Sequence, residues 1–364
     1  MKSIRVKLDT KSSGYNIAIG RGLASQILRY VKSLNPSSLV IVSDRNVAKH
    51  ASKLLARLLS VKCASSPIKI IVAPGEKSKS QQTLNQIYDR CLNAKHPPDR
   101  SAIVIALGGG VVGDLAGYFA ATYLRGIRLL QIPTTLLAMV DSSVGGKTGI
   151  NHSAGKNLIG AFHQPEAVFA DVGLLKTLPE REYVAAIAEV IKYGVVLDAR
   201  LFSQLEKGTK ALLARGPGVL EKVVTACVRN KARVVSADPL EEGMRAVLNY
   251  GHTIGHAVEK ASSYASIRHG EAVSIGMEAA ARIGEAKGIS SARTCQRQSA
   301  LLEAYGLPRF IPKKLKDSML LKALAQDKKR STGSLRFVLP TRTGSWQLWT
   351  CKNRSAALKI ARGG

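Results

Sequence analysis

The sequence predicts an α/β protein with two domains: an N-terminal domain built on a parallel sheet and a mostly α-helical C-terminal domain. Two observations support this prediction. Strand-like and helix-like segments alternate in the first half of the chain, which is typical of a parallel sheet covered on both faces. After about residue 178, long helical patterns follow with few strand signals. Because 364 residues exceed the roughly 100–200 of one domain, we divide the chain into residues 1–175 and 176–364.

Four short apolar runs in the first half are predicted as buried strands. Each run is strand-sized and ends in polar, glycine or proline residues that begin a turn. Helical patterns, such as the one over residues 82–92, separate the runs. The predicted strands cover residues 38–42, 68–72, 102–107 and 127–132.

The second half is predicted to consist mainly of helices. The break Gly216-Pro217-Gly218 stands directly before one of them, as expected for the start of a helix. Near the end of the chain, two extended pieces, residues 335–339 and 346–350, are predicted to form a small hairpin. The predicted helices cover residues 181–195, 220–236, 249–261 and 271–287.

The composition is that of a globular protein, with 45% hydrophobic and 22% charged residues. No apolar run approaches the ~20 residues that a membrane helix needs, and residues 1–9 lack the apolar middle region of a signal peptide. The five cysteines are scattered without a C-x-x-C pair, which argues against a disulfide framework and against a thiolate zinc site. We therefore expect a cytoplasmic protein with no membrane partner.

The charge is strongly positive, with 54 basic and 25 acidic residues and a formal net charge of +29. Residues 291–364 contribute 16 of these basic residues and only 3 acidic ones. Such a field attracts polyanions and steers anionic substrates. However, aromatic residues make up only 5% of the chain, and no nucleic-acid-binding signature is present. We interpret most of the charge as a solvated basic surface and expect no specific nucleic-acid partner.

A glycine cluster follows the predicted strand 102–107 and precedes a helical run. Gly108, Gly110 and Gly113 satisfy G-x-G-x-x-G, in which glycines let the backbone approach a pyrophosphate at a helix N-terminus. The usual acidic residue about 20 positions later is absent, but Asp44 ends a strand upstream, where it could hold a ribose. The alternative is a glycine turn that only packs helix on strand.

Residues 142–148 end like a nucleotide-binding P-loop, but Asp141 stands where that motif needs its first glycine. We interpret this region, together with Gly155, Lys156 and Asn157, as a flexible segment. Its lysines and amide side chains would suit a phosphate or another anion. The alternative is a mobile, solvated loop.

Three of the seven histidines, His252, His256 and His269, occur within 18 residues. His252 and His256 are four apart on a helical pattern and therefore share a face, and Asn249 is predicted to share it too. Glu189 is a carboxylate in an otherwise apolar helix, so it needs a partner such as a metal ion. Two imidazoles and one carboxylate leave a coordination position open, which is typical of a catalytic zinc site. The alternative is a set of ordinary hydrogen-bonded core side chains.

The motifs together resemble those of the 3-dehydroquinate synthases, in that family's order and at its spacing, from about residue 15 to 340. The segments that carry the resemblance are residues 107–114, 132–138, 140–148, 155–160, 188–192, 248–256 and 269–273. It implies two domains with the active site in the cleft, a homodimer, NAD, and one divalent metal ion, Zn or Co. The implied reaction converts 3-deoxy-D-arabino-heptulosonate 7-phosphate to 3-dehydroquinate and phosphate. It would proceed by transient oxidation, phosphate elimination, reduction and aldol closure, as a step of the shikimate pathway.

The resemblance also implies a role for individual residues. The metal ligands would be Glu189, His252 and His269. NAD would be held by Asp44, Glu76, Lys79, Gly109, Gly110, Asp114, Thr134 and Thr135, with Lys147 and Lys156 as further contacts. The substrate would meet Asp141, Lys147, Lys156, Asn157, Lys192, Lys231, Arg245, Asn249 and His256, the last as a candidate proton relay. Arg125 would reach phosphate across the dimer interface, and either Lys328 or Lys329 would supply a late lysine. The strong basic charge is not a requirement of the family.

Three alternatives stay open at this point. A sister sugar-phosphate cyclase would use another sugar phosphate, although residues 155–165 resemble the dehydroquinate branch. A metal-dependent NAD polyol dehydrogenase would accumulate NADH. A nucleic-acid-binding module would bind DNA with strong salt dependence.

Overall fold

The computed structural model describes residues 1–7, 14–238, 243–262, 266–328 and 335–363. The chain divides into two compact units, which we call the first unit (residues 1–178 and 220–236) and the second unit (residues 179–219 and 237–364). The first unit thus takes in residues 220–236, which lie late in the sequence. The folding boundary expected at residues 175/176 stays a prediction. Among the described residues, no helix combines the length and the apolar character needed to cross a bilayer.

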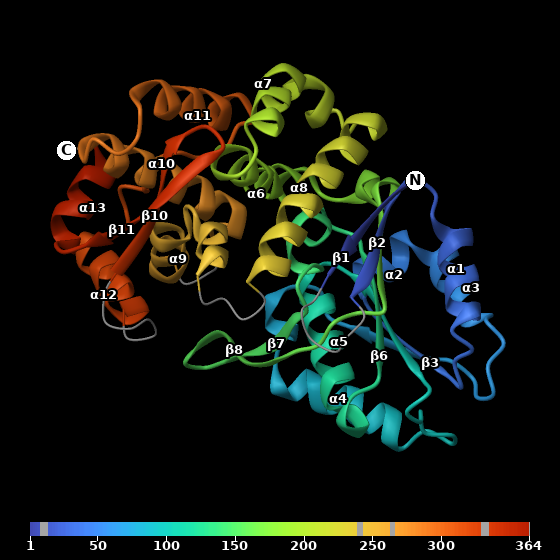
Figure 1. Cartoon of the computed structure of the whole chain (residues 1–364). Coiled ribbons are helices and arrows are strands. Elements are labelled where there is room, and N and C mark those ends of the chain that lie inside the picture. The colour runs from blue at the N-terminus through green and yellow to red at the C-terminus, as the bar shows by residue number, and fades with distance from the viewer. Residues whose placement is uncertain (8–13, 239–242, 263–265, 329–334, 364) are drawn as a thin grey trace. The chain divides into compact units, whose positions relative to one another are not determined.

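A seven-stranded sheet forms the centre of the first unit, with the strand order β1-β2-β9-β6-β5-β3-β4 (Figure 1). From β2 to β4 all neighbouring strands are parallel, which confirms the predicted parallel sheet, and β1 adds an antiparallel edge. All four predicted strands are present, and β1, β2 and β9 were not predicted. The strands are β1(Lys2–Val6), β2(Tyr15–Gly20), β3(Leu39–Asp44), β4(Ile68–Val72), β5(Ile103–Gly108), β6(Arg128–Pro133) and β9(Ala167–Asp171).

Helices cover both faces of this sheet because the central strands are apolar on both sides. In β3, Val40 and Val42 belong to a core shared with α4 and α5, whereas Leu39 and Ile41 belong to a core shared with α1 and α3. A strand buried on both faces reads as a continuous apolar run, which explains why it was predictable. The helices of this unit are α1(Ala24–Ser33), α2(Arg45–His50), α3(Ser52–Leu59), η1(Glu76–Ser78), α4(Gln81–Leu92), α5(Gly110–Thr122), η2(Tyr123–Arg125), η3(Ala138–Ser142), η4(Val172–Thr177) and α8(Pro217–Ala237).

The segment predicted to be a flexible anion-binding loop is an antiparallel hairpin instead. β7(Lys147–His152) pairs with β8(Gly155–Phe162). Gly149 and Gly160 lie opposite each other in the hairpin, and a Cβ on Gly160 would lie 2.1 Å from the Thr148 carbonyl oxygen. The glycines that suggested flexibility therefore permit close pairing of two strands.

Asp171, at the end of β9, anchors the beginning of α1 to the sheet. Its Oδ1 accepts hydrogen bonds from the backbone N–H of Gly22 (3.0 Å) and Gly173 (2.9 Å), and its Oδ2 accepts one from Leu23 (2.8 Å). We expect Asp171→Ala to lower the free energy of unfolding by about 2–3 kcal/mol, because buried N–H groups lose a charged acceptor. Asp171→Asn should be intermediate, since the amide keeps only one acceptor oxygen. Urea unfolding of the three proteins checks this, and an unchanged midpoint for Asp171→Ala would contradict it.

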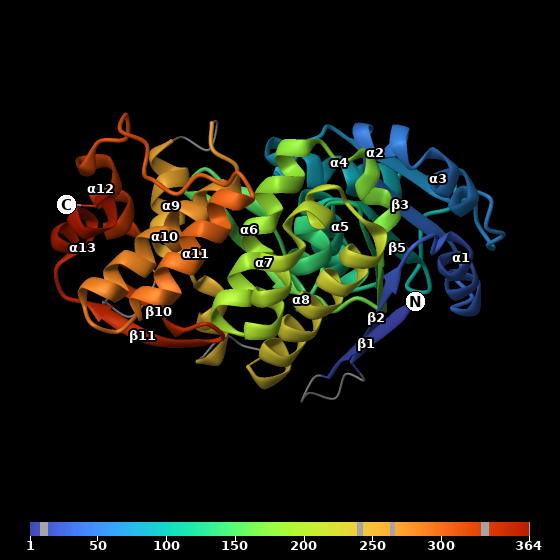
Figure 2. The ribbon, with the colours of Figure 1, turned by 90° about the horizontal axis from the view of Figure 1, so that it is seen from above.

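The second unit consists of helices and one hairpin. The predicted hairpin is confirmed as β10(Leu335–Arg342) paired with β11(Ser345–Cys351), and Figure 2 shows α9, α10 and α11 side by side. The helices are α6(Glu180–Val196), α7(Ala199–Leu213), η5(Met244–Asn249), α9(His252–Ala261), α10(His269–Ala286), α11(Ala292–Ala304), α12(Asp317–Lys328) and α13(Arg354–Arg362).

One helix of the second unit begins later than predicted. The helix expected over residues 249–261 starts at His252, because Gly251 has a φ of 78° and separates it from η5. Asn249 is the last residue of η5, so the prediction that it shares a helical face with His252 is wrong. The left-handed conformation of Gly251 breaks the 3.6-residue period that the prediction assumed.

Candidate active site

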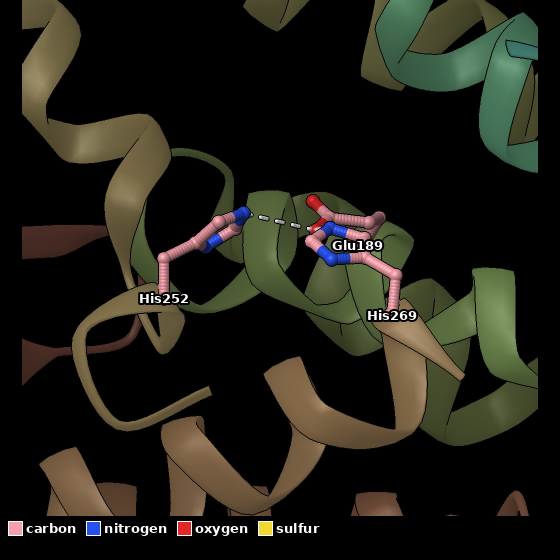
Figure 3. Close-up of side chains that lie close together, drawn as sticks. All are labelled: Glu189, His252 and His269. Carbon is pink, nitrogen blue, oxygen red and sulfur yellow. Dashed lines mark ion pairs between the residues drawn. The ribbon is translucent and has the colours of Figure 1, made fainter. Parts of the chain in front are cut away.

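Glu189, His252 and His269 come together in the second unit, from α6, α9 and α10 (Figure 3). One potential ligand atom from each residue lies within 4.8 Å of the other two. Glu189 Oε1 is 3.4 Å from Nε2 of His252 and 3.4 Å from Nε2 of His269. Glu189 is 1% exposed, so its carboxylate is shielded from water and lies next to two imidazoles.

Close helix packing brings these three side chains together. A Cβ on Gly270, next to His269, would lie 1.8 Å from the carbonyl oxygen of Ala185, one turn before Glu189 on α6. A Cβ on Gly276 would lie 1.8 Å from the carbonyl oxygen of Gly251, next to His252. Helices α6, α9 and α10 therefore touch through their backbones, which only glycine allows.

Hydrogen bonds and an ion pair orient the side chains of the cluster. Nδ1 of His252 lies 3.0 Å from the carbonyl oxygen of Tyr250, so the ring donates there and its Nε2 lone pair faces Glu189. Lys192, 2% exposed, forms an ion pair with Glu189 and donates to the Leu248 carbonyl at 2.9 Å. The His256 ring is 5.2 Å from that of His252, which confirms that the two histidines share a face of α9.

The two imidazoles differ in their affinity for protons. Burial lowers the pKa of His252 to about 3, against the opposing effect of Glu189. Burial acts in the same direction on His269, but the hydrogen bonds that its ring donates to Glu189 and Glu259 outweigh burial and raise the pKa of His269 to about 10. Ligation needs the Nε2 lone pair, so metal binding at His269 has to release a proton.

The donor set fits a divalent metal ion. Two imidazole nitrogens and one carboxylate oxygen are the ligands that Zn²⁺ and related ions accept, and three protein ligands leave a position for substrate oxygens. The cluster is the one group of three or more potential ligand side chains identified among the described residues. Its three residues are those that the family resemblance implies as metal ligands, and their role as ligands stays a prediction.

In the first unit, several of the predicted NAD contacts lie at one edge of the sheet. Asp44 ends β3, Gly109 follows β5 and precedes α5, and Thr134 follows β6, with its N–H donating to the Gly108 carbonyl at 2.9 Å. These strands are parallel neighbours, so their carboxyl ends meet at the same edge, where dinucleotides bind in such folds. The Asp44 carboxylate also caps α2 through Asn46 and Val47.

The glycines at this edge have protein atoms close to where a side chain would begin. A Cβ on Gly109 would lie 2.9 Å from Thr135 Cγ2, and a Cβ on Gly110 would lie 3.0 Å from Ser142 Oγ. In the described part of the chain, the Thr134 hydroxyl is buried without a hydrogen-bond partner, so a ligand at this edge could supply one. Helix α5 begins at Gly110, and its first N–H groups are suited to a pyrophosphate.

The predicted cofactor residues Lys79 and Asp114 form a buried ion pair. The Lys79 ammonium also donates to the Asn157 side chain. Burial raises the pKa of Asp114, while Lys79 counteracts this. Asn151 extends the network, since it donates to Glu76 at 2.7 Å and accepts from the Asn157 N–H at 2.9 Å. One network of hydrogen bonds and an ion pair thus joins these predicted NAD contacts to the β7–β8 hairpin.

The remaining predicted contacts are spread over both units. Lys231, on α8, donates to the Asp141 side chain at 2.7 Å and to the Asp141 carbonyl at 2.8 Å, within the first unit. Arg245 is 3% exposed in the second unit. Four further predicted contacts are exposed: Arg125, Lys147, Asn249 and His256. Lys156 is half-buried on β8.

Lys328 ends α12, with a side chain that lies outside the described residues, and Lys329 lies outside them entirely.

Three residues near these sites were missed by the sequence reasoning. Asn151 bridges Glu76 and Asn157. Asp238 accepts from the N–H groups of Gly243 and Arg245, and thereby holds the segment that carries Arg245. Glu259 lies against His269. The only signal for Glu259 was that a carboxylate stands on the apolar face of a predicted helix. No local pattern marked Asn151 or Asp238.

Solved structures of known proteins share this fold. A 2-deoxy-scyllo-inosose synthase solved with carbaglucose-6-phosphate, NAD⁺ and Co²⁺ superposes with a TM-score of 0.86, at 26% identity over 100% of both chains. A 2-epi-5-epi-valiolone synthase from Streptomyces hygroscopicus, solved with NAD⁺ and Zn²⁺, also has a TM-score of 0.86, at 27% identity over 98% of this chain and 99% of that one. Fold and site therefore place the chain in one structural class with these synthases.

Sequence comparison narrows the class to a family. The model of the 3-dehydroquinate synthase N-terminal domain matches residues 69–185, and that of the C-terminal domain matches residues 186–330. The 3-dehydroquinate synthase of Geobacter metallireducens is 45% identical over 361 residues, which is 99% of each chain. The chain belongs to the 3-dehydroquinate synthase family.

Proposed function

We propose that this protein is an NAD- and metal-dependent 3-dehydroquinate synthase. It converts 3-deoxy-D-arabino-heptulosonate 7-phosphate to 3-dehydroquinate and phosphate, as a phosphate-eliminating carbon–oxygen lyase of the shikimate pathway. The observation that carries the proposal is the cluster of Glu189, His252 and His269 within 4.8 Å in a chain of this family. Related synthases solved with NAD⁺ and Co²⁺ or Zn²⁺ support the same two cofactors here.

When bound, the metal ion would supply a Lewis acid for a substrate hydroxyl, and NAD would supply the reversible hydride acceptor. Glu189, His252 and His269 would hold the metal, and the ion pair with Lys192 holds the Glu189 carboxylate in place. Thr134, Gly109 and Gly110 bind the dinucleotide, with Lys79 and Asp114 beside them. In this proposal turnover requires both the metal ligands and the dinucleotide contacts.

The substrate carries a carboxylate and a phosphate, which explains the number of cationic side chains in the predicted site. Lys147, Lys156, Lys231 and Arg245 neutralise these groups and orient them. Lys231 is itself oriented by two hydrogen bonds to Asp141. Asn157 and Asn249 add neutral donors and acceptors for the hydroxyl groups.

His256 is the proposed proton relay. It is exposed, and its ring is 5.2 Å from that of His252 and 6.3 Å from that of His269. An imidazole in this place can exchange protons with water while the substrate is bound at the cluster.

Phosphate release from the heptulosonate substrate tests the proposal. The protein loaded with NAD should release phosphate, lose activity in a chelator, and recover it with Zn²⁺ or Co²⁺. No net NADH should appear, because the hydride returns in each cycle. Phosphate release that is indifferent to chelation would contradict the metal-dependent mechanism.

The same assay separates the alternatives. A sister cyclase would prefer sedoheptulose 7-phosphate. A polyol dehydrogenase would accumulate NADH, which is followed by its absorbance. DNA binding that exceeds substrate affinity at low salt and falls steeply with added salt would favour a nucleic-acid-binding module.

We further propose a cytoplasmic homodimer, on the basis of the family resemblance. Arg125, exposed in a turn where its φ is 66°, is the residue proposed to reach the phosphate of the neighbouring subunit. Size-exclusion chromatography with light scattering tests the dimer. Mixing an Arg125→Ala protein with a Lys147→Ala protein tests the shared site, because only crossed contacts restore activity in mixed dimers.

A further inference from the structure

A second carboxylate lies beside the metal cluster, on the far side of one imidazole. Glu259, on α9, has its Oε2 3.4 Å from Nδ1 of His269. Nε2 of the same ring is 3.4 Å from Oε1 of Glu189. The His269 ring therefore lies between two carboxylates, and Glu259 faces the ring nitrogen that is turned away from the cluster.

The surroundings of Glu259 argue against an incidental contact. Glu259 is 4% exposed, and its neighbours Ala257, Val258 and Ala261 on α9 are buried as well. A charged carboxylate in such a position costs several kcal/mol unless it has a cationic or hydrogen-bonding partner. The His269 ring provides such a partner, with its Nδ1 3.4 Å from the Glu259 carboxylate.

We propose that Glu259 is a positioning residue for the metal centre. It accepts the Nδ1–H of His269, fixes the tautomer and the orientation of the ring, and leaves the Nε2 lone pair for the metal ion. This inference rests on the metal site of the proposed function. Glu259 itself is not a ligand, since it lies on the opposite side of the imidazole from Glu189.

The two histidine ligands are thus supported differently. His252 is oriented by a neutral backbone carbonyl, that of Tyr250, at 3.0 Å. His269 is oriented by a carboxylate, which makes an imidazole a stronger electron donor to a metal. Only the second support is a side chain, so only this one can be removed by substitution without changing the backbone.

Metal affinity of the full-length protein tests the proposal. Zn²⁺ and Co²⁺ affinities are measured by competition with a chromophoric chelator, for the wild type, Glu259→Gln and Glu259→Leu, and the visible spectrum of the Co²⁺ form is recorded. We expect Glu259→Leu to bind about 100-fold more weakly and Glu259→Gln about tenfold more weakly, because the amide keeps an acceptor but loses the charge. The Co²⁺ spectrum of Glu259→Leu should shift as well.

Glu278→Gln is the matched control. Glu278 is also a buried carboxylate of the second unit, 6% exposed, but it pairs with Arg282 at 3.1 Å. Its substitution should leave metal affinity and the Co²⁺ spectrum unchanged, even if it lowers stability. This control separates loss of a buried charge from loss of support for His269.

Wild-type affinity and an unchanged Co²⁺ spectrum in Glu259→Leu would overturn the proposal. If Glu259→Leu does not fold, wild-type affinity in the isosteric Glu259→Gln would overturn it in the same way. A His252→Ala variant that binds Zn²⁺ and Co²⁺ as tightly as the wild type would instead refute the metal site of the proposed function, so the two failures are distinguishable.

Discussion

Replacing His252 with alanine is expected to abolish turnover and metal binding while leaving the fold intact. The imidazole Nε2 is 3.4 Å from Glu189 Oε1, and alanine has no side-chain atom that could bind a metal ion. A catalytic metal contributes several kcal/mol to the transition state, so we expect kcat/KM to fall by about a thousandfold or more. Metal content is measured by atomic emission after dialysis, and turnover by phosphate release.

Two substitutions serve as controls for this experiment. Lys147→Ala should also abolish turnover but keep the metal, because Lys147 is a proposed substrate contact and is not one of the three clustered ligand side chains. His50→Ala, at an exposed position at the end of α2, should change neither quantity. A His252→Ala protein with full metal content and wild-type rate would show that His252 is not a ligand.

Replacing Gly270 with alanine is expected to disrupt both the packing of α10 on α6 and the metal centre. The new Cβ would lie 1.8 Å from the carbonyl oxygen and 2.4 Å from the carbonyl carbon of Ala185, both backbone atoms that cannot rotate away. Ordinary contacts are about 3.5 Å or longer, so the two helices have to separate. Overpacking of this kind costs about 1–3 kcal/mol or more. Metal sites tolerate displacements of only about 0.2 Å.

Gly208→Ala is the matched control for this prediction. Gly208 lies within α7, and a Cβ there would meet nothing within 4 Å. Alanine should therefore stabilise the helix by about 0.5–1 kcal/mol and leave the metal affinity unchanged. Thermal unfolding and chelator competition on both variants test the pair. The packing argument fails if Gly270→Ala unfolds at the wild-type temperature with unchanged metal affinity.

Elements with a strong local pattern were predictable from the sequence. β3 and β5 are continuous apolar runs because they are buried on both faces, and their length and flanking residues identified them as strands. The turn between β5 and α5 was marked by glycines. The ligand types were also predictable, since imidazole and buried carboxylate are chemically suited to a metal wherever the chain brings them together.

Elements that depend on distant packing were not predictable. The β7–β8 hairpin was interpreted as a flexible loop, because glycine has the same local signature in a loop and in closely paired strands. The assignment of residues 220–236 to the first unit has no local signal either, since a helix pattern says nothing about which core it joins. The break at Gly251 displaced Asn249 from the face of His252 for the same reason.

The sequence by itself determined the class of fold, the residue types of the metal cluster and the family to which they point, because these depend on side-chain chemistry and short-range periodicity. Only the tertiary structure decided the geometry of the cluster and the place of Glu259 behind His269. Backbone contact between α6, α9 and α10 at Gly270 and Gly276 sets those positions. Such contacts join segments far apart in the chain, and no local pattern encodes the distance between them.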